Sequence, residues 1–337
     1  MKKLVMYTNS SASAQWRLQD PAKYMDFEIR FPQNGIQEED IQWADAVTLQ
    51  GCIDKESIAM IAYYKDQGKK LVLEQDDRII VEDDNPHKKQ HDITNASKII
   101  EITAGMADMI TCTTPYLAKN LSIYNKNVVV LPNYMDMKRW DLPQKNKNTN
   151  RDQIRIGWGG SITHLEDINM ILPVLHRLYK EFPKIMLVFV GDPRISDFME
   201  GLPSEVMMGV PFDGWPSKLH SLRLDIAIAP LRDSEFNKNK SNIKSLEYGI
   251  AKYPGVYSPT VYGELGFDGC RGLIASDLEG WYQAIKNLIN NPYLGEEISR
   301  MAYNYTKNNY NLEKNIGEFN DAYNSLFDSG KQSAKLE

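Results

Sequence analysis

Two stretches of the chain carry residue types that suit the binding of an anion. The first, at 154–168, reads IRIGWGGSITHLEDI: an apolar run, closely spaced glycines, then an amphipathic helix pattern. A strand, a Gly-rich turn and a helix N-terminus bring together unpaired backbone N–H groups and the positive end of the helix dipole. Gly159 and Gly160 would let a phosphate approach the backbone, and Ser161 and Thr163 can donate hydroxyls. The structural alternative is a tight turn that serves only helix and sheet packing.

The helix after these glycines is expected to begin near His164. Thr163 and Glu166 have the spacing of a capping box, and apolar residues recur behind them at helical spacing. A dinucleotide-binding fold expects G-x-G-x-x-G and an acidic residue about 20 positions further on. Thr163 stands where the third glycine belongs, and the acidic candidate Asp192 comes late. A nicotinamide-dependent oxidoreductase therefore stays only as an alternative.

The second stretch, at 230–258, reads PLRDSEFNKNKSNIKSLEYGIAKYPGVYS. A polar loop leads to a helix that is expected to begin near Ser241, a good N-cap residue. Lys240, Lys244 and Glu247 follow at helical spacing, so all three are expected to face one side. Two cations suit a diphosphate, and a carboxylate one turn further suits ribose hydroxyls. The alternative is a solvated helix face on which Lys244 and Glu247 form an ordinary surface pair.

Polar residues also follow the predicted strands of the first half of the chain. Ser11 and Arg17 come after the first strand, and Asp76 and Asp77 end a later one. We expect these four residues on the acceptor side of the site, where they would bind sugar or acceptor hydroxyls. The alternatives are a helix cap for the first pair and a solvated loop for the second.

A metal site is not predicted. His87 and His91 are four apart, but no third ligand is close in sequence. The cysteines also lack metal-ligand spacing. We expect them to be buried thiols of a protein in a reducing compartment. Trp158 and Trp215 are expected to pack in the core, with stacking on a base or sugar as the alternative.

Length and composition indicate an ordinary globular protein of two domains. The chain has 337 residues, of which 42% are hydrophobic and 25% charged, and its net charge is −6. The acidic balance argues against a partner that is bound chiefly through a phosphate backbone. No apolar stretch approaches the roughly 20 residues that span a bilayer, and the apolar run near the N-terminus is too short for a signal peptide. We therefore expect a cytoplasmic protein.

The elements that must position these residues alternate between strand and helix. Strands are expected at 4–7, 27–31, 46–49, 70–74, 109–113 and 128–132, and again at 155–158, 185–190, 225–230 and 272–276. Such alternation predicts parallel sheets with helices on both faces. A polar stretch at 139–153 separates the two series and has the composition of a linker. Ligands of open α/β sheets bind at the carboxyl ends of the strands, so a cleft between two such sheets is the expected site.

In this order, the motifs resemble those of nucleotide-sugar glycosyltransferases of the GT-B fold, particularly the large retaining group called family four. The matching motifs are IGWGGSITHLEDI, LVFVGDP, FDGW, DIAIAPL and FNKNKSNIKSLEYG. SASAQWRLQDPA, GKKLVLEQDD and VLPNYMD match more loosely. The resemblance implies an α/β fold of two Rossmann-like parallel-sheet domains that face a central cleft. Its parts would be an acceptor-side domain at 1–140, a linker at 141–153, a donor domain at 154–310, and a helix at about 311–328 that packs back on the first domain.

The resemblance also assigns roles to residues. The family's helix carries a Glu, seven residues and a second Glu; the second maps on Glu247 and implies a contact with the nucleotide ribose, whereas the first maps on Asn239. The Arg and Lys that the family uses to hold the diphosphate are replaced here as well. Candidates for catalysis are Lys240, Lys244 and Glu247. Candidates for donor binding are Gly159, Gly160, Ser161, Thr163, His164, Asn239 and Ser241.

What the resemblance implies is a metal-independent, retaining hexosyltransferase that uses a UDP- or GDP-sugar and needs no other cofactor. The acceptor is expected to be a saccharide or a hydroxymethylated DNA base, because virus-encoded base glucosyltransferases share the GT-B architecture. A DNA-facing surface would be sought at Lys88, Lys89, Lys145, Lys147 and Arg151. Because Asn239 stands where the family has Glu, a catalytically silent nucleotide-sugar binding module is a second alternative.

Overall fold

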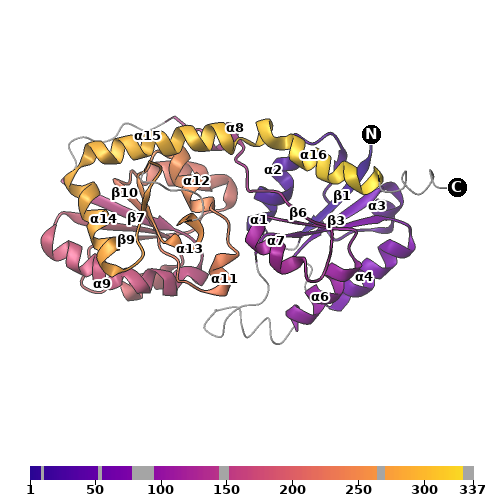
Figure 1. Cartoon of the computed structure of the whole chain (residues 1–337), viewed down its shortest axis with the longest axis horizontal. Coiled ribbons are helices and arrows are strands. Elements are labelled where there is room, and N and C mark those ends of the chain that lie inside the picture. Colours follow the sequence, from indigo (N-terminus) through magenta and orange to yellow (C-terminus); the bar gives the residue numbers. More distant parts are fainter. Residues whose placement is uncertain (9–10, 52–54, 78–94, 144–151, 264–269, 329–337) are drawn as a thin grey trace. The chain divides into compact units, whose positions relative to one another are not determined.

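The computed structural model describes residues 1–8, 11–51, 55–77, 95–143, 152–263 and 270–328 (Figure 1). The chain divides into two compact units. The first comprises Met1–Tyr134, Asn239–Ser241 and Leu312–Glu337, and the second comprises Met135–Lys238 and Asn242–Asn311. Each unit contains one sheet.

The sheet of the first unit is parallel throughout. Its strands are β1 (Lys3–Thr8), β2 (Glu28–Arg30), β3 (Ala46–Gln50), β4 (Lys70–Gln75), β5 (Met109–Cys112) and β6 (Val128–Val130). They lie in the order β2-β1-β3-β4-β5-β6. The order of the strands reverses between β1 and β3, and open α/β sheets bind ligands near such a switch point.

Helices cover the sheet of the first unit. They are α1 (Ser11–Ala14), the π-helix η1 (Gln15–Gln19), α2 (Asp20–Ala22), α3 (Glu38–Trp43), α4 (Lys55–Asp66), α6 (Ala96–Met106), α7 (Pro115–Leu121) and α16 (Leu312–Asp328). Between sheet and helices lie fully buried Val47, Leu71 and Ile110. The last helix joins this core through Tyr323, whose hydroxyl is hydrogen bonded to Thr48 Oγ1 at 3.2 Å.

The second unit also has a six-stranded parallel sheet. Its strands are β7 (Ile154–Gly159), β8 (Ile185–Gly191), β9 (Ser204–Met208), β10 (Ile226–Ala229), β11 (Gly255–Tyr257) and β12 (Leu273–Ile274). They lie in the order β12-β11-β10-β7-β8-β9. The first strand of this unit, β7, lies in the middle of the sheet, with β8 and β9 on one side of it and β10, β11 and β12 on the other. This is the strand order of the Rossmann fold. The switch point of this sheet therefore lies between β7 and β10.

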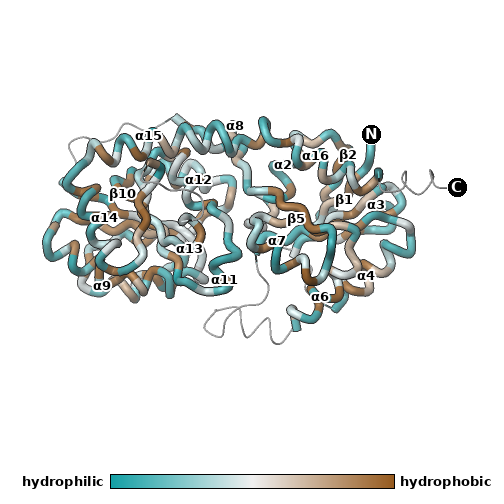
Figure 2. Tube along the Cα trace, viewed as in Figure 1, coloured by the Kyte–Doolittle hydropathy of each residue, from teal (hydrophilic) through white to brown (hydrophobic). Residues whose placement is uncertain are grey.

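Helices of the second unit bury an apolar face on this sheet. They are α8 (Met137–Trp140), η2 (Ile162–His164), α9 (Leu165–Glu181), η3 (Pro193–Phe198), η4 (Phe212–Gly214), α10 (Trp215–Ser221), α11 (Glu235–Lys238), α12 (Ile243–Ile250), α13 (Pro259–Tyr262), α14 (Leu278–Asn290) and α15 (Pro292–Asn309). In α9, Ile168, Ile171 and Leu175 form the buried stripe. Figure 2 shows the result as hydrophobic strands, such as β5 and β10, within more hydrophilic surroundings.

The predicted α/β class and all ten predicted strands are confirmed, although their ends shift by a few residues. Two strands were missed. β9 is a half-buried edge strand whose sequence, SEVMM, has no apolar alternation. β11 has only 3 residues and follows Pro254 directly, so its pattern is too short to separate from a loop.

The boundary between the units differs from the predicted one at residue 140. The first unit ends at Tyr134, and Trp140 belongs to the core of the second unit. The Trp140 side chain is fully buried against Phe212, and its carbonyl oxygen is hydrogen bonded to His220 Nε2 at 3.2 Å. Most of the predicted linker lies outside the described residues. No helix in the described part of the chain is both long and apolar enough to cross a membrane.

Candidate functional site

The two stretches that were predicted to bind an anion follow neighbouring strands of the second unit, although Asn239–Ser241 within the second stretch group with the first unit. β7 and β10 are neighbouring parallel strands, with Ile156 opposite Ile226 and Gly157 opposite Ala227. The segments that leave their carboxyl ends therefore start at the same edge of the sheet. This edge is the switch point of the strand order, where ligands of such sheets bind.

The first group of residues at this edge, which we call the Trp215 cluster, comprises Gly159, Trp215, Lys244 and Glu247. Trp215 Nε1 donates a hydrogen bond to Glu247 Oε1 at 2.8 Å, and Lys244 Nζ donates to Glu247 Oε2 at 2.7 Å. The Lys244 ammonium also lies 5.5 Å from the centre of the Trp215 ring. Glu247 is only 3% exposed. The carboxylate of the pair is thus buried and the Lys244 side chain is 18% exposed, so the predicted alternative of a solvated surface pair is wrong.

Gly159, the last residue of β7, and Gly160 directly after it are explained by packing against two indole rings. A Cβ added to Gly159 would lie 2.4 Å from Trp215 Cη2, and one added to Gly160 would lie 2.3 Å from Trp158 Cζ2. The N–H of Gly160 donates to Val190 O at 3.0 Å, so it is already engaged within the sheet. The packing alternative therefore accounts for both glycines without a phosphate. Trp158 lies in the core as expected.

The second group, which we call the Asp167 cluster, comprises His164, Asp167, Arg232 and Asn237. Asp167 is 2% exposed, and its Oδ2 accepts a hydrogen bond from His164 Nδ1 at 2.8 Å. Its Oδ1 accepts from the backbone N–H of Arg232 at 2.9 Å and from Asn237 Nδ2 at 3.0 Å. One buried carboxylate therefore ties the segment after β7 to the segment after β10.

The sequence analysis did not single out Asp167, although it predicted the helix that carries this residue. The sequence did contain a signal: Asp167 is four positions before Ile171, so it lies on the apolar stripe of the helix and not on its polar face.

Charged residues of both clusters affect the pKa of one buried residue, Tyr262. Burial, and then the charges of Tyr257, Glu247 and Asp167, raise the pKa of Tyr262 well above its ordinary value.

The first helix begins at Leu165 with His164 as its N-cap residue, which agrees with the predicted start near His164. The predicted capping box of Thr163 and Glu166 does not form, because a 3-10 turn at 162–164 precedes the α-helix. The Thr163 hydroxyl instead contacts the Ser161 hydroxyl at 2.6 Å. The second helix begins at Ile243 with Asn242, not Ser241, as its N-cap residue.

Lys240 does not share a helix face with Lys244 and Glu247, as was predicted. It precedes the helix, and its ammonium forms an ion pair with Asp77 of the first unit at 3.1 Å. The neighbouring residues are held by the same unit. Asn239 is fully buried and accepts a hydrogen bond from Asn120 Nδ2 at 2.8 Å. Ser241 Oγ accepts one from Asn133 Nδ2 at 2.8 Å.

Arg17 is a buried structural residue of the first unit and not a surface contact for a ligand. Its guanidinium donates to Glu74 at 2.6 Å from Nε and to the Leu131 carbonyl oxygen at 2.6 Å from Nη1. It also donates to Asn133 Oδ1 at 3.0 Å, and Thr111 donates a short hydrogen bond to Glu74. Its side chain is 1% exposed. These hydrogen bonds and the Glu74 carboxylate offset the cost of burying the Arg17 charge away from water.

Asp76 and Asp77 follow β4 at the carboxyl edge of the first sheet. Asp76 is half-buried, and burial, with the charges of Asp77 and Glu74, raises its pKa to about 6, against the opposing effect of a hydrogen bond from Ser13. Asp77 is the partner of Lys240. Asp76 is therefore not a solvated loop residue, whereas the Asp77 side chain is 41% exposed. Ser11 lies in α1, and its side chain falls outside the described part of the structure.

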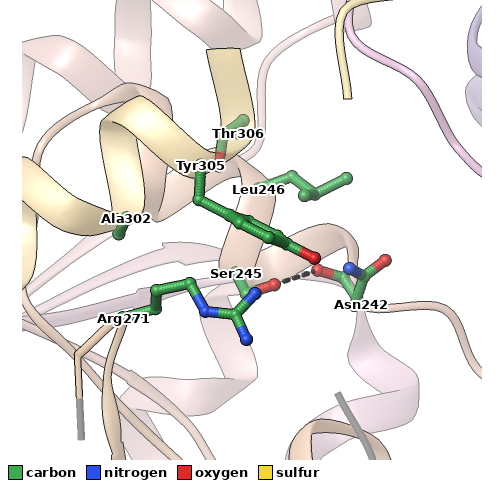
Figure 3. A pocket seen from close by; sticks show the side chains of 7 residues that line it. All are labelled: Asn242, Ser245, Leu246, Arg271, Ala302, Tyr305 and Thr306. Atoms are coloured by element: carbon green, nitrogen blue, oxygen red, sulfur yellow. Dashed lines mark hydrogen bonds between the residues drawn. The ribbon is translucent and has the colours of Figure 1, made fainter. Parts of the chain in front are cut away.

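A small pocket opens on another face of α12, between this helix and α15 (Figure 3). Its lining includes Ser245, which donates a hydrogen bond to the Asn242 carbonyl oxygen at 2.8 Å, and Arg271, whose guanidinium lies 3.8 Å from the centre of the Tyr305 ring. Neither Lys244 nor Glu247 lines it. The pocket is therefore separate from the Trp215 cluster.

Several predicted residues lie outside the described ranges. They are His87, His91, Lys88, Lys89, Lys145, Lys147 and Arg151. Among the residues that the structure describes, no group of three or more His, Cys, Asp or Glu side chains is placed to hold a metal ion.

No family model matches the chain, and no curated protein is similar to it in sequence. Solved structures share its fold. HepE of Anabaena in complex with UDP and glucose has a TM-score of 0.72 at 11% identity, over 96% of this chain and 100% of that one. Sucrose-phosphate synthase of Thermosynechococcus elongatus has a TM-score of 0.67 at 11% identity, over 98% and 100%. TarM has a TM-score of 0.60 at 13% identity, and the match spans 83% of this chain but only 54% of TarM.

This chain has two parallel six-stranded sheets, each flanked by helices, and its fold superimposes on those of HepE and sucrose-phosphate synthase over almost its whole length. The chain therefore has an α/β fold of the GT-B type, as these solved structures do.

Proposed function

We propose that this protein transfers a sugar from a nucleoside diphosphate sugar to a hydroxyl acceptor, and that the second unit binds the donor. The observation that carries the proposal is the buried Glu247 carboxylate, held by Trp215 and Lys244 beside the carboxyl end of β7. Because a buried charge is costly, such a pair at a sheet switch point is a candidate functional site. Among the structural neighbours, HepE is in complex with UDP and with UDP-glucose, so UDP is the first nucleotide to test.

Donor binding would proceed by an exchange of partners at Lys244. The ammonium has three donors and sits on a flexible stem, so an incoming diphosphate draws it away from Glu247. The freed Oε2 then accepts hydrogen bonds from the ribose hydroxyls, while Trp215 still holds Oε1. This order explains how a carboxylate that is buried before binding serves as the ribose contact that the family resemblance implies.

In the transfer step, Lys244 would stabilise the negative charge that develops on the departing diphosphate. No general base of high strength is needed if the diphosphate itself steers the acceptor to the same face of the sugar, which gives retention. The acceptor hydroxyl would come from a saccharide or a hydroxymethylated DNA base. Asp76 and Asp77 are the proposed contacts for it, because they end a strand at the carboxyl edge of the first sheet.

The nicotinamide alternative is disfavoured by Asp192. This carboxylate follows β8, the strand after which a dinucleotide site presents an acid to the ribose. Arg194 occupies it instead: Nε and Nη2 donate to its two oxygens at 2.8 and 2.7 Å, and this pairing lowers the Asp192 pKa to about 2. A ribose would have to displace that bidentate contact.

The test is nucleotide binding by titration calorimetry with UDP, GDP, ADP, TDP and CDP, repeated on Lys244→Met and Glu247→Gln. Lys180→Met, an exposed lysine near the end of α9, is the matched control. We expect one nucleotide to bind the parent and the control alike, and both site variants to lose roughly 10- to 100-fold in affinity. A folded parent that binds none of the five would overturn the proposal. Slow hydrolysis of the bound sugar nucleotide separates an enzyme from a silent binding module.

A further inference from the structure

His164 is held by a buried carboxylate directly after the glycines of the proposed donor site. Its Nδ1 lies 2.8 Å from Asp167 Oδ2, and a carboxylate only accepts, so Nδ1 carries the proton. The ring also lies 5.9 Å from Trp158, the indole on which Gly160 packs. Although His164 is the N-cap residue of α9, its side chain makes no capping hydrogen bond.

The two oxygens of Asp167 are used for different tasks. Oδ1 accepts hydrogen bonds from the loop after β10, from the Arg232 backbone N–H and the Asn237 side-chain amide. Oδ2 accepts a hydrogen bond from His164 Nδ1. The charged groups near the imidazole include Asp167 on α9 and the Arg232 guanidinium, whose Nε is 3.7 Å from Asp167 Oδ1. Exposed Glu166 follows two positions along the chain. A buried carboxylate at hydrogen-bond distance favours the protonated ring.

We propose that His164, positioned by Asp167, is a titrating cation that binds the diphosphate of the sugar nucleotide, so that donor affinity depends on pH. The inference rests on the proposed function, because it assigns a ligand to the same site. With Nδ1 turned to Asp167, protonation of the ring takes place at Nε2 and adds one N–H donor and one positive charge. Lys244 supplies a second cation at this edge of the sheet.

The sign follows from linkage. An anion binds the protonated ring more tightly than the neutral one, so affinity is highest at low pH and falls as the ring loses its proton. Histidine side chains change charge between about pH 5 and pH 8. The proposal therefore expects affinity to fall about tenfold between roughly pH 6 and pH 8.

The experiment measures the Kd of UDP-glucose by calorimetry across this pH range. UDP-glucose is used in place of UDP because a terminal phosphate has its own proton, with a pKa of about 6, whereas the esterified diphosphate has none in this range. Four variants accompany the parent: His164→Gln, His164→Lys, Asp167→Asn and, as a control on the same helix, His176→Gln.

His164→Lys is expected to bind tightly at every pH, and His164→Gln weakly at every pH, because one keeps the charge and the other lacks it. His176→Gln should keep the parent profile. Asp167→Asn should move the fall in affinity to lower pH; a purely structural role for Asp167 would weaken binding without moving it. If Asp167→Asn fails to fold, the two His164 variants still decide the question.

Two outcomes overturn the inference alone: UDP-glucose affinity of the parent that does not change with pH, or a His164→Gln variant that keeps the parent's pH profile. If the folded parent binds UDP-glucose at no pH while another nucleotide binds, the profile is measured with the sugar form of that nucleotide. If none binds, the proposed function itself fails. The two failures are thus distinguishable.

Discussion

Trp215 and Glu247 form the central contact of the second unit's candidate site: the indole N–H donates to the carboxylate at 2.8 Å. The two residues are 32 positions apart, on α10 and α12. Gly159, at the end of β7, also takes part in this contact, because its lack of a side chain leaves room for the Trp215 indole. Strand, indole and carboxylate therefore depend on one another, and each can be altered separately.

Replacing Gly159 with Ala tests the strand end. The added Cβ would lie 2.4 Å from Trp215 Cη2, so the indole must shift and its hydrogen bond to Glu247 must lengthen or break. We expect a loss of about 1–3 kcal/mol in the free energy of unfolding and at least about tenfold in nucleotide affinity. Urea denaturation and calorimetry measure the two effects.

Gly317→Ala is the matched control for that change. Gly317 lies within α16 and has open space around the position of a Cβ. Alanine should raise the free energy of unfolding by about 0.5–1 kcal/mol, because glycine is a poor helix former. Equal losses in both variants would show that Gly159 has no particular relation to Trp215.

The Lys244–Glu247 pair should behave as a buried pair in a double-mutant cycle. Lys244→Met leaves a carboxylate that is 3% exposed without its cation, which should cost about 1–3 kcal/mol of stability. Glu247→Gln keeps an acceptor for Trp215 and should cost less. The double variant should recover about 1–2 kcal/mol relative to the sum of the single ones. Additive losses, measured by urea denaturation, would contradict direct coupling.

Arg17 should be essential for the stability of the first unit. Arg17→Met removes a guanidinium that is 1% exposed and leaves the Glu74 carboxylate buried, which should cost about 3–5 kcal/mol. The control is Arg300→Met, since Arg300 pairs with Glu297 on the surface of α15 and should change stability by no more than about 0.5 kcal/mol. Thermal unfolding of both variants provides the comparison.

The raised pKa of Asp76 makes stability depend on pH. Its pKa is about 6 in the folded protein, above the ordinary value of 3.8, so the folded state holds the proton more firmly than the unfolded chain. The favourable contribution is complete below about pH 4 and is lost as pH rises through about 6. Asp76→Asn keeps an acceptor for Ser13 and removes the ionised form.

Asp76→Asn should therefore be more stable than the parent at about pH 8, by roughly 1–2 kcal/mol, with the difference vanishing near about pH 4. Denaturation curves at the two pH values measure it. A variant that gains stability but loses transfer activity is the expected sign of a functional carboxylate, because functional sites carry such costs. A gain of equal size at both pH values would contradict the raised pKa.

Much of the fold was predictable because strand and helix patterns are local. The predicted strands lie where LVMY, AVTL, KLVLE and IMLVFV suggested, since short apolar β-branched runs between turn residues have few other uses in an α/β protein. The alternation of elements also predicted that the segments after β7 and β10 leave one edge of the sheet. Both stretches that carry candidate donor residues were located on this basis.

The contacts that define the site depended on the tertiary structure. Asp167 binds Arg232 and Asn237, which are 65 and 70 positions away, and no periodicity within one helix indicates such partners. Lys240 was expected beside Lys244, but it pairs with Asp77, 163 positions away, because the helix begins only after it. Arg17 was expected near a ligand and is buried instead, because Glu74 and the Leu131 carbonyl oxygen converge on it.

The sequence by itself determined the class of fold, the places of most strands and the two stretches at which anion chemistry is concentrated. The tertiary structure decided which side chains in those stretches meet: Trp215 with Glu247, His164 with Asp167, and Lys240 with Asp77. The physical reason is the range of the interactions. Propensity and hydrophobic period act over one element, whereas a buried hydrogen bond forms between whichever elements the order of the strands brings together.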